Sequence, residues 1–163
     1  MSEIDLGPVT VTLNMTPQSE GRPTNFRTTT FATVEQAASR APFRVTVPAA
    51  ILDGHELLDA ALMTDPKAVL ALTYVEKATG RHYIIVQSLL DPAAPGPKPV
   101  VRTVGEEMAV SSVGTSEAAV VVGDAPAGTP RPVSILWTKN DLLLQVSGVG
   151  YAPQDLEAIA SSL

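Results

Sequence analysis

Apolar and polar residues alternate along much of this chain, which is the pattern of a β-strand with one buried face. The alternation is clearest over 9–13, where Val9, Val11 and Leu13 are separated by threonines. Two runs, 68–76 and 82–89, are apolar on both faces, which is typical of strands in the middle of a sheet. The glycine-containing turn over 77–81 joins them, so the two runs predict a central hairpin.

Further extended segments predict an antiparallel sheet of six or more strands. They cover 24–31, 100–104, 108–113, 117–122, 133–138 and 142–147. The first of these is expected to form an N-terminal β-hairpin with 9–13, the next three a meander, and the last two a final hairpin. The stretch 56–63 fits a strand or a helix, and we favour a strand because strands follow it.

Two segments carry the signals of helices. Thr33 and Gln36 have the spacing of a capping box, which predicts a short helix near 33–40 that ends before Pro42. A C-terminal helix is expected near 153–162, because Pro153 suits a first helical turn and apolar residues recur at helical spacing. With both helices packed on the sheet, the fold class is α+β.

Composition narrows the range of functions. At 163 residues, 45% of them hydrophobic and 17% charged, the chain fits a single folded domain over 1–163. The net charge of −6 disfavours nucleic acid as a partner, and acidic membrane surfaces too. The chain has no cysteine, which excludes disulfides, thiolate metal sites and cysteine nucleophiles. No apolar run approaches the roughly 18 residues of a spanning helix, so we expect no direct membrane insertion.

The polar residues show no catalytic or metal-binding pattern. His55 and His82 are the only histidines, and neither has carboxylates at the spacing of a metal site. Ser147 lacks the preceding glycine of a nucleophile elbow. Glu106 and Glu107 are expected in a solvated turn, and Trp137 in the core. We therefore predict no catalytic residues, no metal and no cofactor, with an unrecognised hydrolase as an alternative.

Short motifs in a fixed order resemble an uncharacterised bacterial domain family found on the outer side of membrane-anchored anti-sigma factors and in related lipoproteins. The motifs are Ala41–Pro48, Leu52–Leu57, Leu72–Tyr74, Ile84–Gln87, Ile135–Trp137, Leu144–Gly148 and Asp155–Leu163. They cover 33–163, and 1–32 has no counterpart. Asp53, His55 and Asp141 depart from the residues usual in that family. The resemblance implies an extracytoplasmic, non-enzymatic module without catalytic residues; without it, the cytoplasm is the expected location.

A complete fold pattern without a site pattern favours a binding or sensor module, the outer domain of a membrane-anchored regulator or lipoprotein. Its partner would be another protein, or an apolar ligand, at the cell envelope. An alternative is a carrier that holds an apolar ligand in a cavity between the sheet and the helices.

The N-terminal hairpin needs an apolar partner, because an isolated hairpin is marginally stable in water. It either extends the sheet of its own chain, leaving an edge strand for a partner, or pairs with a second copy in a dimer. We favour a monomer because the segment carries Arg22 and Arg27 among its threonines. The residues of the candidate partner-binding edge are Thr24, Phe26, Thr28 and Thr30.

Overall fold

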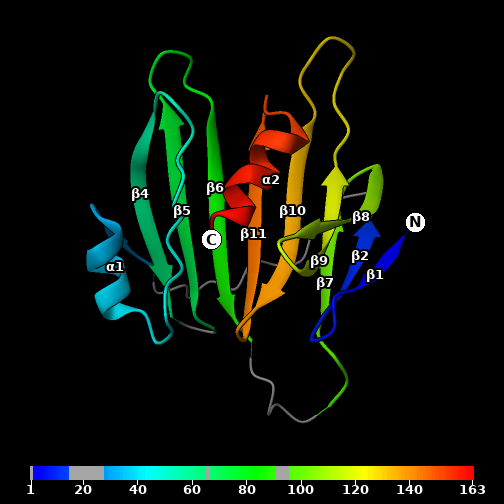
Figure 1. Cartoon of the computed structure of the whole chain (residues 1–163), viewed down its shortest axis with the longest axis horizontal. Helices are drawn as coiled ribbons and strands as arrows, with labels where there is room; N and C mark the ends of the chain where they lie inside the picture. Colours follow the sequence, from blue (N-terminus) through cyan, green and yellow to red (C-terminus); the bar gives the residue numbers. More distant parts are fainter. Residues whose placement is uncertain (1, 15–27, 65–66, 91–95) are drawn as a thin grey trace.

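The computed structural model describes residues 2–14, 28–64, 67–90 and 96–163, which form two sheets and two helices (Figure 1). The larger sheet has eight strands in the order β3-β4-β5-β6-β11-β10-β9-β8, and every neighbouring pair is antiparallel. Its strands are β3 (Thr28–Phe31), β4 (His55–Met63), β5 (Val69–Glu76), β6 (His82–Leu89), β8 (Glu107–Val113), β9 (Ser116–Val122), β10 (Pro132–Lys139) and β11 (Leu142–Val149).

The smaller sheet holds three strands in the order β1-β2-β7. They are β1 (Glu3–Asp5), β2 (Thr10–Asn14) and β7 (Val100–Val104). β1 pairs antiparallel with β2, whereas β2 and β7 are parallel.

The helices are α1 (Val34–Arg40) and α2 (Pro153–Ser161), close to the predicted bounds. The Thr33 hydroxyl accepts a hydrogen bond from the Gln36 amide at 3.2 Å, so Thr33 is the N-cap. The Gln36 side chain accepts a hydrogen bond from the Ala32 amide rather than from Thr33. The predicted α+β class with an antiparallel sheet is confirmed, and the ambiguous stretch 56–63 lies in a strand.

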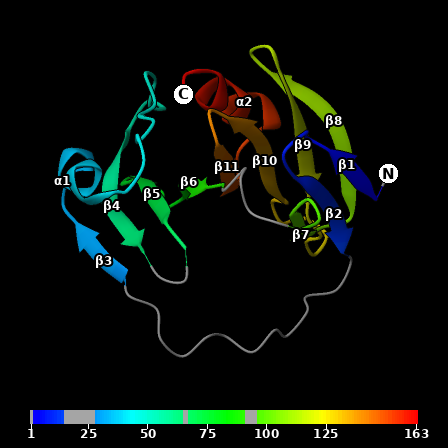
Figure 2. The ribbon, with the colours of Figure 1, turned by 90° about the horizontal axis from the view of Figure 1, so that it is seen from below.

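The large sheet has a different cover on each face (Figure 2). One face, here called the helical face, packs against both helices and against the irregular residues 41–54, here called the strap. Its core contains Trp137 and Tyr74, which are 1% and 2% exposed, as predicted for core aromatic residues. The other face, here called the outer face, is covered by the small sheet over β8, β9 and β10, where Val9 and Val11 are fully buried.

Two predictions about strand pairing are wrong. β2 and β3 form no hairpin, because β2 belongs to the small sheet and β3 pairs with β4 at the edge of the large sheet. β7 does not join β8 and β9 in a meander, because it pairs with β2. An alternating pattern shows which residues face a core, but it does not identify the strand that supplies the backbone partners.

Among the described residues, no helix has the length and apolar character needed to cross a lipid bilayer.

Candidate functional site

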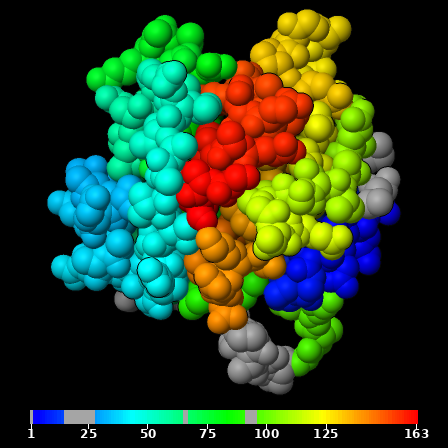
Figure 3. Space-filling model, viewed as in Figure 1, coloured from blue at the N-terminus to red at the C-terminus, as the bar shows by residue number. Residues whose placement is uncertain are grey.

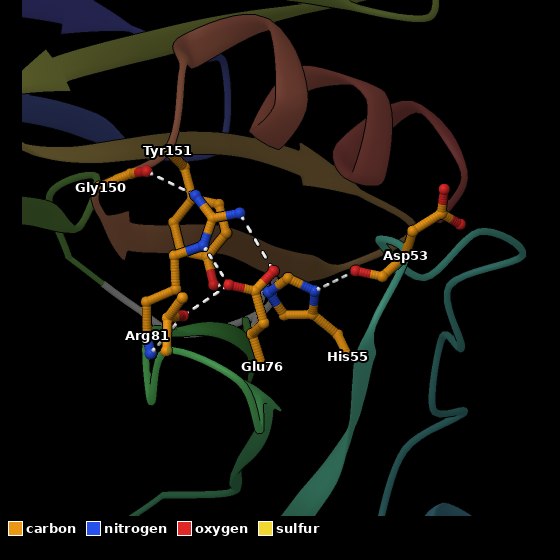
Figure 4. Close-up of polar contacts among 7 residues, drawn as sticks. Asp53, His55, Glu76, Arg81, Gly150 and Tyr151 are labelled. Atoms are coloured by element: carbon orange, nitrogen blue, oxygen red, sulfur yellow. Dashed lines mark hydrogen bonds and ion pairs between the residues drawn. The ribbon is translucent and has the colours of Figure 1, made fainter.

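Three tyrosines and a histidine form a cluster near the ends of β5, β6 and β11 (Figure 4). Strand register places Tyr74 opposite Tyr83, and the two rings stack with centroids 5.3 Å apart. Tyr151, just beyond β11, meets Tyr83 edge-on at 5.7 Å. His55, at the start of β4, lies 5.4 Å from the Tyr83 ring. We call these four residues the tyrosine–histidine cluster.

A glycine allows Tyr151 to lie on the sheet. Gly148 pairs with Tyr83 across β11 and β6. A Cβ atom at Gly148 would lie 2.6 Å from the Cδ2 atom of Tyr151, closer than side-chain atoms approach each other. The cluster therefore depends on the absence of a side chain at this strand position.

Both ring nitrogens of His55 are engaged. Nδ1 lies 3.0 Å from the Asp53 carbonyl oxygen and Nε2 lies 2.7 Å from the Tyr151 hydroxyl. Because a carbonyl oxygen only accepts, Nδ1 carries the hydrogen, and in neutral His55 Nε2 accepts from Tyr151. Figure 4 shows His55 between the strap and Tyr151. The histidine thus joins the strap to the segment that follows β11.

An ion pair covers the outside of the cluster. The Arg81 guanidinium lies 4.6 Å from the centroid of the Tyr151 ring. Its Nε and Nη2 atoms donate to the Glu76 carboxylate at 3.1 and 3.3 Å, and Nη1 donates to the Gly150 carbonyl at 2.8 Å. The hydrogen bond from the Thr79 hydroxyl, followed by those from Arg81, lowers the pKa of Glu76. Arg81 therefore holds the β11–α2 connection against the β5–β6 hairpin.

Tyr83 differs from His55 and Tyr151, whose polar side-chain atoms are hydrogen-bonded. Its side chain is fully buried, and its hydroxyl makes no hydrogen bond of good geometry with any described residue. Burial raises the pKa of Tyr83 to about 12, although the nearby Leu52 backbone acts in the opposite direction.

One residue that the sequence analysis considered for chemistry, His55, belongs to the cluster. The described residues of the cluster offer no cysteine or serine nucleophile, and the polar atoms of His55, Glu76 and Arg81 are held by neighbouring groups. These contacts connect the start of β4, the β5–β6 hairpin and the segment that follows β11.

The other candidate residues lie apart from the cluster. His82 is exposed at the start of β6, and Ser147 shares a hydrogen bond of 2.8 Å with Ser134 on the outer face. The predicted turn residues Glu106 and Glu107 lie 2.8 and 3.6 Å from Arg131 nitrogens. Among the described residues, no group of three or more His, Asp or Glu side chains could hold a metal ion.

The candidate partner-binding edge is described in part. Thr28 and Thr30 are exposed in β3, which is an edge strand of the large sheet. Thr24 and Phe26 lie outside the described residues. Binding at this edge stays a prediction.

Sequence reasoning missed the role of Gln87. This side chain is fully buried, and its Oε1 atom accepts from the Thr46 amide at 2.8 Å while its Nε2 atom donates to the Thr46 carbonyl at 2.6 Å. The Gln87 side chain thus makes the two hydrogen bonds with the Thr46 backbone that a neighbouring strand would otherwise make. It holds the strap on the helical face. The signal was available, because Gln87 follows Ile84–Val86 in an apolar central strand, where a polar residue requires buried partners.

Two surface grooves adjoin these elements. One, here called the strap groove, has a volume of about 550 Å³ and is lined by 42–47, Leu89 and 139–142. The strap (cyan) and the β10–β11 turn (orange), which form its walls, lie side by side in Figure 3. The second groove, of about 480 Å³, crosses the ends of β6, β10 and β11 and includes Ile84, Ser134 and Ser147 of the outer face.

Comparison with protein families, with characterised proteins and with solved structures found no match to this chain.

Proposed function

We propose that this chain is a non-enzymatic binding module that engages a partner protein through the outer face of β4, β5 and β6. The observation that carries the proposal is a continuous set of half-buried, mostly apolar side chains on this face. The set consists of Ala61, Met63, Val69, Ala71, Thr73, Val75, Ile84 and Val86, and two half-buried polar residues of the same face, Asp59 and Ser88, lie beside Thr73 and Val69. A contiguous apolar surface of this kind on a folded chain is typical of a site of association.

Strand register makes the surface continuous. Ala61, Ala71 and Val86 lie side by side across β4, β5 and β6, as do Met63 and Val69 in the next row. The small sheet packs on the other half of this face, over β8, β9 and β10, and no described helix or strand packs on the half formed by β4 to β6 (Figure 2). Among the described residues, this half of the sheet therefore has no second layer packed on it.

The second groove supports a different candidate, a carrier of an apolar ligand. Its volume of about 480 Å³ is within the range of small-molecule sites, and Ile84, Val133 and Val149 give it apolar walls. Between the sheet and the helices, where a carrier cavity was predicted, Trp137 and Leu156 are buried, and the hollow lined by Trp137 and Ala160 has a volume of about 210 Å³, smaller than the second groove. A protein partner would cover the apolar surface of β4, β5 and β6, whereas a ligand in the second groove would contact this surface only near Ile84. We therefore favour a protein partner.

We further propose that the module lies outside the cytoplasm, as part of a membrane-anchored regulator or lipoprotein. This part of the proposal rests on the resemblance of 33–163 alone.

Site-specific photocrosslinking in cells that express the chain tests the proposed face. A photoreactive residue at Thr73, in the middle of the face, is expected to capture a discrete protein band. The same residue at Glu117, which is exposed on β9, is the control and is expected to capture none. If Thr73 and its cross-strand neighbour Ile84 capture no discrete protein, the outer face is not a protein-binding surface. Capture of a small molecule instead would favour the carrier.

A further inference from the structure

The small sheet ends at β7, which pairs with β2 along one edge and with no described strand along the other. The Gly105 amide, just after β7, donates to the Asn14 carbonyl at 3.1 Å. Backbone groups of successive residues in a strand point to opposite edges, so the odd-numbered residues of β7 pair with β2. The amides and carbonyls of Val100 and Val104 therefore point to the second edge, and they make no hydrogen bond to any described residue.

This second edge of β7 carries exposed apolar side chains. Val100 and Val104 are 55% and 51% exposed, with Arg102 between them, whereas Val101 packs against the second core. Proteins usually protect an edge strand from pairing with other chains by charged side chains, prolines, bulges or a covering segment. An edge with two exposed valines and free backbone groups is suited to accept a further strand.

The second edge of β7 is directed toward the uncovered half of the outer face. In Figures 1 and 2, β2 and β1 lie on one side of β7, and β11 and β6 lie on the other. Val101 of β7 and Leu143 of β11 pack against the same core. Neighbouring strands are about 4.8 Å apart and packed sheets about 10 Å apart. A strand paired with β7 would therefore lie over the outer face of β11 and β6.

The matching edge of a second copy does not fit beside β7. Two copies of β7 that pair antiparallel are related by a two-fold axis perpendicular to the small sheet, so both large sheets would lie in the same layer. The large sheet of each copy extends beyond β7 through β11, β6, β5 and β4 (Figure 2), and the two large sheets would overlap. The space beside β7 thus admits an extended segment without a sheet packed beneath it.

We propose that β7 accepts an extended β-strand of the partner protein, which continues the small sheet over the outer face of β11 and β6. The backbone of this strand pairs with Val100 and Val104. Apolar residues at alternate positions of the strand face Ile84, Val86 and Leu143, and polar residues between them face solvent. This inference rests on the proposed function, because it specifies how the partner covers the outer face.

Selection from a library of decapeptides with alternating apolar and polar residues, followed by amide NMR of the full chain, tests strand addition. In the free chain the amides of Val101 and Thr103 are expected to be protected from hydrogen exchange, and those of Val100 and Val104 to exchange rapidly. A selected peptide is expected to shift the signals of Val100 and Val104 and to slow their exchange.

Proline substitution gives a matched pair of variants. Val104→Pro removes an amide that does not pair with β2, and it is expected to weaken peptide binding by about threefold to tenfold. Val110→Pro is the control at an exposed valine of β8, which is also an edge strand. Because Val113 pairs with β9 at a two-residue turn, the Val110 amide points away from β9. Val110→Pro should leave binding unchanged, and thermal unfolding checks that both variants fold.

Two results would overturn the inference. One is a selection that yields no peptide able to slow exchange at Val100 and Val104; the other is peptide binding that Val104→Pro leaves unchanged. Equal capture of a protein at Thr73 by the native chain and by Val104→Pro would also overturn strand addition, while leaving the outer-face function intact. Conversely, peptide pairing along β7 without any protein captured at Thr73 or Ile84 would contradict only the outer-face function.

Discussion

At the scale of single residues, the hydroxyl of Tyr83 is a buried polar group without a partner of good geometry among the described residues. Burying a hydroxyl without a hydrogen bond costs about 1–3 kcal/mol. Tyr83→Phe keeps the stacked ring and removes that hydroxyl, so we expect the free energy of unfolding to stay equal or to rise by up to about 1 kcal/mol. Urea denaturation monitored by tryptophan fluorescence measures the change, and a loss above about 1 kcal/mol would mean that the hydroxyl is paired in solution.

The same variant has a defined pH dependence. The pKa of Tyr83 rises from the ordinary 10.0 to about 12 on folding, so between these values the folded state binds more protons than the unfolded state. The contribution of Tyr83 is complete below pH 10 and declines as the pH rises toward 12. We expect the stability of the native chain to fall more steeply over this range than that of Tyr83→Phe, measured in the same titration of urea midpoints.

At the scale of elements, the strap has no regular secondary structure and depends on the side chain of Gln87. Gln87→Met keeps a similar volume and leaves the Thr46 amide and carbonyl without their buried partners. We expect a loss of about 1–3 kcal/mol in the free energy of unfolding, together with faster hydrogen exchange over 42–48. Exchange in β5 and β6 should change little.

Gln145 provides the control for this variant. It lies in the adjacent strand β11, is only half-buried, and donates to the Ser147 hydroxyl at 2.9 Å on the outer face. Gln145→Met should change stability by less than about 0.5 kcal/mol and leave exchange of the strap unaltered. Equal effects of the two variants would show that Gln87 does not fasten the strap.

At the scale of the whole molecule, the small sheet completes the second core. Val9 and Val11 are fully buried against residues of the large sheet that include Val121 and Leu136. A chain that begins at Thr33 would therefore expose this core, and we expect it to unfold at a lower temperature and to associate. Thermal unfolding and light scattering measure both effects, with the full chain as reference.

The full chain is expected to be a monomer in the same light-scattering measurement. β1 and β2 pair within the chain and with β7, and β3 extends the large sheet, so these N-terminal strands need no second copy as a partner. A full-length dimer that becomes monomeric when 1–32 is removed would contradict this expectation.

The sequence by itself determined the local elements, because their causes are local. Alternation and β-branched runs marked most of the strands, the Thr33 cap and Pro42 bounded α1, and Asn140 and Asp141 adopt the left-handed backbone that the final hairpin requires. The burial of Trp137 followed from its apolar surroundings.

Only the tertiary structure decided which distant elements meet. Backbone hydrogen bonds carry no side-chain code, so the pairing of β2 with β7 and of β3 with β4 could not be predicted from alternation. The same reason hid the candidate sites. His55 and Tyr151 are 96 positions apart, and Thr46 and Gln87 are 41 apart. The sequence around each of these residues gives no sign of its partner. The partner comes within hydrogen-bond distance only when the sheet, the strap and the helices pack together.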